Sequence, residues 1–209
     1  MDFQEEEEEE NIKVILIGDA GVGKTNLINV SSGGVFNDNE KSSLSASYLK
    51  KQITIDGVIY NLSLWDTIGQ EKLRSLSKIF FKNSKIVIYV YDITNLETFK
   101  GLESWDNDVK EMIDDDNIIK AIVGNKQDLY LKEEVSEDKA SDYAKTLNAK
   151  FRLTSAKTEP KGFNSFLEEL LKDYLYKKGK DGKGEEQKNK NLKLNKKKGN
   201  HPHKKKKWC

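Results

Sequence analysis

A glycine-rich segment near the start of the chain has the residue types and spacing that hold a phosphate group. It fits the pattern G-x-x-x-x-G-K-[ST] in full, and its residues are Gly18, Asp19, Ala20, Gly21, Val22, Gly23, Lys24 and Thr25. Glycines let a backbone wrap closely around phosphate, with N–H groups pointing inward and a helix N-terminus behind them. Lys24 then reaches the β- and γ-phosphates, and the Thr25 hydroxyl binds Mg²⁺. We include Asn26 among the candidate phosphate contacts, and the alternative is an ordinary glycine-rich turn.

A second candidate group begins at Asp66, which follows an alternating apolar segment at residues 59–65. An acid at the end of a neighbouring strand is placed to hold a metal ion, directly or through water. Asp66 opens the sequence Asp-Thr-Ile-Gly-Gln-Glu, in which Gly69 can offer its N–H to a γ-phosphate and Gln70 can orient an attacking water. Alone, this acid is weak support, because many strands end in Asp at a turn.

Two further segments each follow a predicted strand and have the chemistry to bind a purine base. In the first, the Asp128 carboxylate presents two acceptors in one plane, which match the N1–H and N2 amino group of guanine but no donor pair of adenine. Asn125 and Lys126 would brace this loop, with the Lys126 stem covering one face of the base. The second segment contains Ser155, Ala156 and Lys157. Its central N–H can meet the guanine O6, and a plain turn is the alternative for either segment alone.

The segments that must position these residues alternate between apolar runs and helical patterns. Apolar or alternating runs predict strands at residues 14–17, 52–55, 59–65, 86–91, 118–123 and 151–154, with Asp56 and Gly57 as a hairpin turn. Apolar residues at helical spacing predict helices at 24–30, 73–81, 99–113, 136–147 and 163–175. This alternation predicts an α/β fold with a six-stranded, mainly parallel sheet and helices on both faces. Ligands of such sheets bind at the carboxyl ends of the strands.

The two ends of the 209-residue chain differ sharply in charge, although the net charge is only +1. Residues 1–10 hold seven acids and no bases, whereas residues 177–209 hold fourteen lysines and three acids. We predict an acidic disordered arm at 1–10 and a Lys-rich disordered tail at 177–209 around one domain at 11–176. The sequence lacks the apolar run of ~20 residues that a spanning helix needs, and its acidic start is unlike a secretory signal. The single cysteine predicts a reducing compartment.

These motifs, in this order and each at the end of a predicted strand, resemble those of the Ras superfamily of small GTPases, and within it the Rab family. The superfamily resemblance covers roughly residues 11–176 and rests on Lys-Thr at 24–25, Trp-Asp-Thr-x-Gly-Gln-Glu at 65–71, Asn-Lys-x-Asp at 125–128 and Ser-Ala-Lys at 155–157. The Rab resemblance comes from Leu-Trp-Asp-Thr at 64–67, Phe-Phe at 80–81 and Tyr-Val-Tyr-Asp-Ile-Thr at 89–94. Ala46, Tyr48 and Leu49 resemble the endosomal Rabs.

The resemblance implies a P-loop G domain that binds GTP or GDP with Mg²⁺, but the sequence departs from the family in switch I. The family carries a Thr there whose hydroxyl binds Mg²⁺ in the GTP state, and spacing makes Ser43 its equivalent. Phe36 lies seven residues earlier, where the family places an aromatic edge against guanine, although such a residue can also anchor a loop. Ser45 replaces a Gly, and Ile68 replaces an Ala beside the γ-phosphate site. We therefore expect a less ordered active state or slower hydrolysis.

By the same resemblance, the chain is a switch that hydrolyses GTP slowly and regulates membrane traffic. Gln70 would orient the water, while Lys24, Mg²⁺ and the loop N–H groups stabilise the transferring phosphoryl group. The implied partners of the monomeric G domain are an exchange factor, a GTPase-activating protein, a lipid-escort protein and effectors. Two alternatives stay open. One is a non-hydrolysing GTP-binding scaffold, suggested by the switch departures, and the other is a nuclear or nucleic-acid-associated GTPase, suggested by the Lys-rich tail.

The tail ends in four lysines followed by Trp208 and Cys209. Similar GTPases are prenylated on C-terminal cysteines, so the resemblance implies lipidation of Cys209 and, with the lysines, attachment to anionic membrane. The expected location is the cytoplasmic face of endomembranes, in exchange with the cytosol, and no nucleic acid is expected as a partner. Rabs usually end in paired cysteines, however, and no a-a-X sequence follows Cys209, which leaves a free thiol as the alternative.

Overall fold

The computed structural model describes residues 11–38, 47–66, 78–115 and 117–198, with side chains described in these ranges up to residue 180, apart from 47, 78 and 79. The chain divides into two units, Met1–Tyr174 and Leu175–Cys209. The predicted acidic arm, the end of the predicted tail and most of the helix predicted at 73–81 lie outside the described residues.

Six strands form one sheet in the order β2-β3-β1-β4-β5-β6, which confirms the predicted fold class. They are β1 (Asn11–Ile17), β2 (Ser47–Ile55), β3 (Val58–Asp66), β4 (Ile86–Asp92), β5 (Ile119–Asn125) and β6 (Lys150–Leu153). All neighbours are parallel except β2, which pairs antiparallel with β3 at the edge of the sheet, as predicted. The turn between them holds Asp56 at φ 50° and Gly57 at φ 81°, a conformation that suits Asp-Gly.

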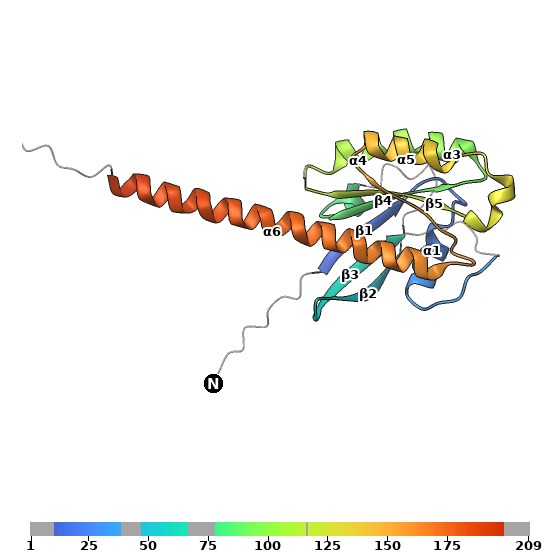
Figure 1. Cartoon of the computed structure of the whole chain (residues 1–209), viewed down its shortest axis with the longest axis horizontal. Coiled ribbons are helices and arrows are strands. Elements are labelled where there is room, and N and C mark those ends of the chain that lie inside the picture. The colour runs from blue at the N-terminus through green and yellow to red at the C-terminus, as the bar shows by residue number, and fades with distance from the viewer. Residues whose placement is uncertain (1–10, 39–46, 67–77, 116, 199–209) are drawn as a thin grey trace, which may run out of the picture. The chain divides into compact units, whose positions relative to one another are not determined.

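Helices cover both faces of this sheet (Figure 1). On one face lie α1 (Lys24–Ser31) and the first turns of α6 (Pro160–Lys198), and on the other lie α3 (Leu96–Lys100), α4 (Leu102–Met112) and α5 (Glu137–Thr146). Two further short helices in the described ranges are α2 (Lys78–Phe81) and the 3₁₀ helix η2 (Gln127–Lys132). The pattern at 99–113 predicts one helix, but the structure has two. Asn95 caps α3 by accepting from the Glu97 N–H, and Gly101 separates α3 from α4.

The core explains why the central strands carry so few polar residues. Every residue of β4 is buried, and its Tyr89 and Tyr91 belong to an apolar cluster with Trp105 of α4 and Ala140 of α5. On the other helix layer, α6 buries an apolar face at the spacing that predicts an amphipathic helix, namely Phe163, Phe166, Leu167, Leu170 and Leu171. Burying large apolar side chains supplies most of the stabilisation that holds such layers together.

The backbone of α6 is helical to Lys198. The sequence pattern instead predicts a helix that ends at residue 175 and a disordered tail from residue 177. Lys, Glu, Gln and Leu are good helix formers, and extending an existing helix is far easier than starting one. The helix can therefore continue beyond residue 175 without apolar residues at helical spacing. Within the described part of the chain, none of the helices is both long enough and apolar enough to span a membrane.

Candidate functional site

The predicted phosphate loop lies between β1 and α1, where it approaches two neighbouring strands. Gly18 has φ 142°, and a Cβ there would come within 2.1 Å of the Val90 carbonyl oxygen. Gly23 has φ 96°, and a Cβ there would lie 2.3 Å from the Asn125 amide nitrogen. Glycine at both positions permits this close approach. Gly23 is also the N-cap of α1 and has no side chain to cover the helix N-terminus, whose N–H groups and dipole favour an anion.

Lys24 is the first residue of α1, and its ammonium group turns back over the loop. Nζ donates to the carbonyl oxygens of Gly18 at 2.7 Å and Asp19 at 2.9 Å, and the residue is only 6% exposed. Burial lowers the pKa of Lys24 to about 8, although the Asp66 and Asp19 carboxylates act in the opposite direction. A phosphate group beside Nζ would favour the charged form, because an opposite charge raises the pKa of a lysine.

Thr25 and Asp66, the two predicted metal ligands within the described residues, meet at the carboxyl end of β3. The Thr25 hydroxyl donates to Asp66 Oδ2 at 2.6 Å, and Asp66 is buried. Parallel pairing of β1 with β3 produces this meeting, because Leu16 lies opposite Asp66 in the register. A hydroxyl and a carboxylate are hard oxygen donors of the kind that Mg²⁺ takes, so these two residues fit the ion.

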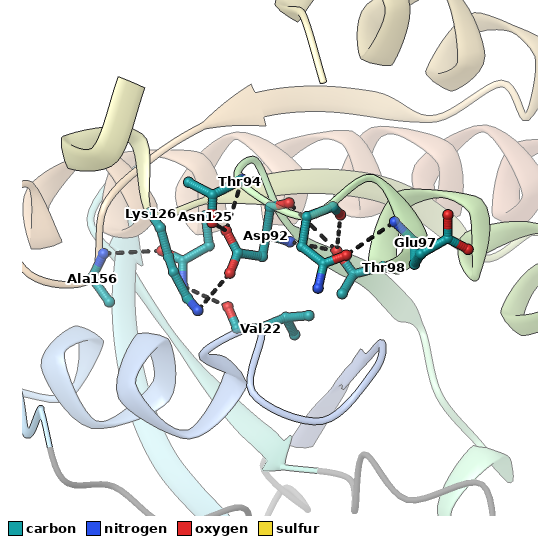
Figure 2. Close-up of polar contacts among 9 residues, drawn as sticks. Val22, Asp92, Thr94, Glu97, Thr98, Asn125, Lys126 and Ala156 are labelled. Atoms are coloured by element: carbon teal, nitrogen blue, oxygen red, sulfur yellow. Dashed lines mark hydrogen bonds and ion pairs between the residues drawn. The ribbon is translucent and has the colours of Figure 1, made fainter. Parts of the chain in front are cut away.

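Asn125, the last residue of β5, connects the phosphate loop to the second base segment (Figure 2). Its Nδ2 donates to the Val22 carbonyl oxygen at 2.8 Å, and its Oδ1 accepts from the Ala156 N–H at 3.1 Å. Asn125 is buried, so both hydrogen bonds are shielded from water and are stronger than exposed ones. The structure thus brings phosphate and base segments together on one side chain.

Asp128 and Ser155 come from the two separate base segments and bond to each other. The Ser155 hydroxyl donates to Asp128 Oδ1 at 2.5 Å. The same hydroxyl oxygen accepts from the backbone N–H groups of Lys157 and Thr158, both at 3.1 Å. These contacts hold the loops against each other and tie the Asp128 carboxylate to the second segment through its Oδ1 atom.

Phe36 lies beside the same loops. The Lys157 Nζ is 5.5 Å from the Phe36 ring centroid, and it bonds to both carboxylate oxygens of Asp38 at 3.1 and 3.2 Å. From α1, the Asn26 side chain exchanges two hydrogen bonds of 3.0 Å with the Asn37 backbone. The Asn26 side chain therefore positions the Phe36 segment. The sequence predicts Asn26 only as a phosphate contact and does not indicate this second role.

Among the described residues outside the predicted set, three contact the site through acidic or aromatic side chains. Asp92, at the end of β4, pairs with the Lys126 ammonium at 2.6 Å. Trp105 donates its indole N–H to Asp19 Oδ1 at 2.9 Å, so the Asp19 side chain faces α4. Asp38 is the third. The sequence holds a signal only for Asp92, which is a charged residue at the end of an otherwise apolar strand.

Four of the predicted site residues lie outside the described part of the chain, namely Ser43, Gly69, Gln70 and Cys209. Ser45 and Ile68, the two departures expected near the γ-phosphate, lie outside it as well. The roles assigned to all six stay predictions.

Comparison with known proteins agrees with this arrangement. Residues 13–176 match the Ras family. The Ras-related protein Rab-21 of Geodia cydonium is 39% identical over 163 residues, which cover 78% of this chain and 70% of that protein, and Rab-21 of Homo sapiens gives the same values. The Ras-related protein Rab11B of Nicotiana tabacum is 37% identical over 164 residues, or 78% of this chain and 74% of that protein. The chain therefore belongs to the Ras family, and within it to the Rab small GTPases.

Proposed function

We propose that the segments described above form a site for guanine nucleotide and Mg²⁺, and that this site makes the chain, a Rab GTPase of vesicle traffic, a nucleotide-dependent switch. The observation that carries the proposal is the double contact of Asn125, whose amide bonds to the phosphate loop at Val22 and to the base segment at Ala156. A ligand with a phosphate end and a base end would span both segments.

At the phosphate end, Lys24 and the loop N–H groups would bind the β- and γ-phosphates. The Lys24 ammonium can exchange its carbonyl partners on the loop for phosphate oxygens, which are stronger, charged acceptors. Thr25 and Asp66 would hold Mg²⁺, with Ser43 as a further ligand in the GTP state. When bound, the ion neutralises charge on the β- and γ-phosphates.

At the base end, Asp128 would accept from the N1–H and N2 amino group of guanine, while its Oδ1 atom also accepts from the Ser155 hydroxyl. The Ala156 N–H, which donates to Asn125, would share its hydrogen with the guanine O6. The Lys126 stem and the Phe36 ring would cover the base. Adenine offers no matching donor pair, so the Asp128 carboxylate would keep its bond from Ser155 but gain none from the base, which costs affinity.

Hydrolysis would use the Gln70 side chain to orient the attacking water and the Gly69 N–H to hold the γ-phosphate. Lys24 would stabilise the charge that develops on the transferring phosphoryl group. Intrinsic turnover should be slow, because positioning and charge stabilisation are incomplete until an activating protein adds to them. Ile68 beside Gly69 is expected to slow it further.

An aromatic stack on β2 and β3 supports the role of effectors. The rings of Tyr48 and Trp65 stack with centroids 5.0 Å apart. The Phe80 ring is tilted against Trp65, with 6.1 Å between the two ring centroids. Tyr48 is 54% exposed, so the stack is open to a partner. Trp65 directly precedes the proposed metal ligand Asp66, so this surface and the phosphate site share the end of β3. Exposed aromatic residues of this kind are favoured anchors in protein interfaces.

The proposal extends to the basic tail. Prenylation of Cys209, together with lysines 204–207, would attach the chain to anionic membrane, because one lipid chain alone gives only weak, reversible binding. An exchange factor and a lipid-escort protein would then control where the GTP form accumulates on endomembranes. Flotation with anionic vesicles after prenylation, compared between wild type and Cys209→Ser, measures this attachment.

Single-turnover hydrolysis of GTP by the full chain with Mg²⁺ tests the proposed switch. We expect slow phosphate release from wild type and slower release from Gln70→Leu with GTP binding retained. Asp128→Ala should lose GTP binding. Tight binding of GTP by wild type without any release would favour a GTP-bound scaffold instead of an enzyme, and no binding of GTP would overturn the proposal altogether.

A further inference from the structure

Asp92 is a buried carboxylate beside the proposed base site, and the roles proposed above do not include it. It ends β4 and lies opposite Asn125 in the parallel pairing with β5. The six residues before it in β4 are apolar or aromatic and buried, and Asp92 itself is only 7% exposed. A buried charge is stable only when it is paired and hydrogen-bonded, so its contacts indicate its role.

One oxygen of this carboxylate is held by the turn that follows β4 (Figure 2). Oδ1 accepts from the Thr94 N–H at 2.9 Å and from the Thr94 hydroxyl at 2.7 Å. The Asp92 N–H donates to Thr98 Oγ1 at 3.1 Å, which ties the turn to α3. The other oxygen, Oδ2, lies 2.6 Å from the Lys126 ammonium. Asp92 is thus oriented locally and presents its charge to the base loop.

Lys126 has a backbone conformation that lysine rarely adopts. Its φ of 67° and ψ of 33° lie in the left-handed region, which the Cβ atom disfavours. Its side chain keeps 33% of its surface exposed, and a four-carbon stem with a free end would sample many rotamers. The ion pair with Asp92 removes that freedom by holding the far end of the stem.

We propose that Asp92 is a positioning residue for nucleotide retention, because it holds the Lys126 ammonium so that the methylene stem forms one wall of the base site. This inference rests on the proposed function. A wall that is ordered in advance loses little conformational entropy when the base binds. The effect should appear mainly in the rate of nucleotide release, since contacts in the bound state chiefly determine dissociation rates.

A double-mutant cycle on the full chain tests this role. The dissociation rate of a fluorescent GDP analogue is measured with Mg²⁺ for wild type, Asp92→Asn, Lys126→Met and the double variant. Asp92→Asn keeps the shape of the side chain and removes its charge. We expect each single variant to raise the rate about tenfold, equivalent to about 1.4 kcal/mol. The double variant should match Lys126→Met within about twofold, because Asp92 acts through Lys126.

Two further variants make the cycle decisive. Asp142→Asn breaks the exposed ion pair with Lys145, which spans 2.8 Å, and should leave the release rate unchanged. Thr94→Val removes one hydrogen bond to Asp92 and should raise the rate less than Asp92→Asn does. If circular dichroism shows that Asp92→Asn does not fold, Thr94→Val takes its place in the cycle. Its release rate is then measured both with Lys126 present and in the Lys126→Met variant.

Either of two results would overturn the inference. If Asp92→Asn raises the release rate equally with Lys126 and with Lys126→Met, Asp92 acts through the fold and not through Lys126. If Asp92→Asn leaves the release rate of the otherwise wild-type chain unchanged, Asp92 does not act on nucleotide retention. Failure of the wild type to retain the GDP analogue would instead overturn the proposed function, so the two failures are distinguishable.

Discussion

Trp105 of α4 donates its indole N–H to the Asp19 carboxylate across 2.9 Å, which joins the phosphate loop to a helix 86 positions away in the sequence. The carboxylate also packs against Gly101, where a Cβ would approach Asp19 Oδ2 to 2.8 Å. Through its backbone carbonyl, Asp19 accepts from the Lys24 ammonium. The loop that carries Lys24 is therefore held by α4 as well as by β1 and α1.

Trp105→Phe keeps the aromatic ring in the core and removes only the N–H, so it should loosen the phosphate loop. A hydrogen bond to a charged group contributes about 1.5–3 kcal/mol, and we expect part of that to appear as an about three- to tenfold loss of GDP affinity. Isothermal titration calorimetry with Mg²⁺ measures the affinity, and urea unfolding measures the stability. Lower stability with unchanged GDP affinity would show that the bond serves only the core.

Gly101→Ala provides the control from the other side of the same carboxylate. Its methyl group would press on the end of the Asp19 side chain, which can shift, so GDP affinity should fall but less than in Trp105→Phe. Gly179→Ala is the matched substitution, because a Cβ there meets nothing within 4 Å and the residue is also helical. It should leave affinity unchanged, and equal affinities for the two alanine variants would contradict the packing argument.

The contact of Thr25 with Asp66 could be predicted from sequence, whereas that of Trp105 with Asp19 could not. The phosphate loop is a local pattern, and the carboxyl ends of parallel strands meet at one edge of a sheet, which places Asp66 beside it. The indole contact depends instead on which face α4 presents to the loop. Likewise, Asp92 meets Lys126 because β4 and β5 pair in one register, which no local pattern specifies.

The boundaries of the helices were less predictable than the site. Apolar residues keep their helical spacing across Gly101, which itself has helical angles of φ −58° and ψ −22°, so the pattern alone indicates one continuous helix. In α6, the apolar face ends near Leu175 while the polar residues beyond it are still good helix formers. Patterns of burial and propensities of the backbone therefore point to different ends for the same helix.

Stability should depend on pH through Lys24, because burial lowers its pKa to about 8 from the usual 10.5. Between these pH values the unfolded chain binds more protons than the folded chain, so the free energy of unfolding should rise with pH. Relative to Lys24→Met, we expect wild type to gain about 2–3 kcal/mol from pH 8 to pH 10.5. Urea unfolding without nucleotide at several pH values measures this. If the difference in unfolding free energy between wild type and Lys24→Met does not change with pH, the pKa of Lys24 is not lowered by burial.

Asp38→Asn should have a small effect, in contrast to Asp92→Asn. Its ion pair with Lys157 is exposed, with 69% and 48% of the side-chain surfaces accessible, and such pairs contribute at most about 1 kcal/mol. We expect GDP release to quicken less than about threefold, and the change to vanish at about 1 M salt, where exposed charges are screened. Release rates across a salt series check this. A large change that persists in high salt would give Asp38 a direct part in holding the nucleotide.

Asp106 should stabilise the fold through contacts that do not involve the proposed nucleotide ligands. Its buried carboxylate accepts from the Tyr89 hydroxyl at 2.7 Å and pairs with Lys120 at 2.7 Å and Lys110 at 2.8 Å. Burial alone would raise the pKa of Asp106, but the hydrogen bonds from these partners outweigh it and lower the pKa below the usual 3.8.

We expect Asp106→Asn to lower the free energy of unfolding by about 3 kcal/mol at pH 7, because it leaves the half-buried Lys120 ammonium without its counter-charge. A carboxylate with a lowered pKa stabilises above its unfolded value and loses that contribution as the pH falls through its folded value. The gap between wild type and variant should therefore narrow below pH 3.8. Urea unfolding at pH 7, 5 and 3 measures it, with the exposed Asp142→Asn as control. A gap of equal size at pH 3 and pH 7 would mean that the amide disturbs packing rather than charge.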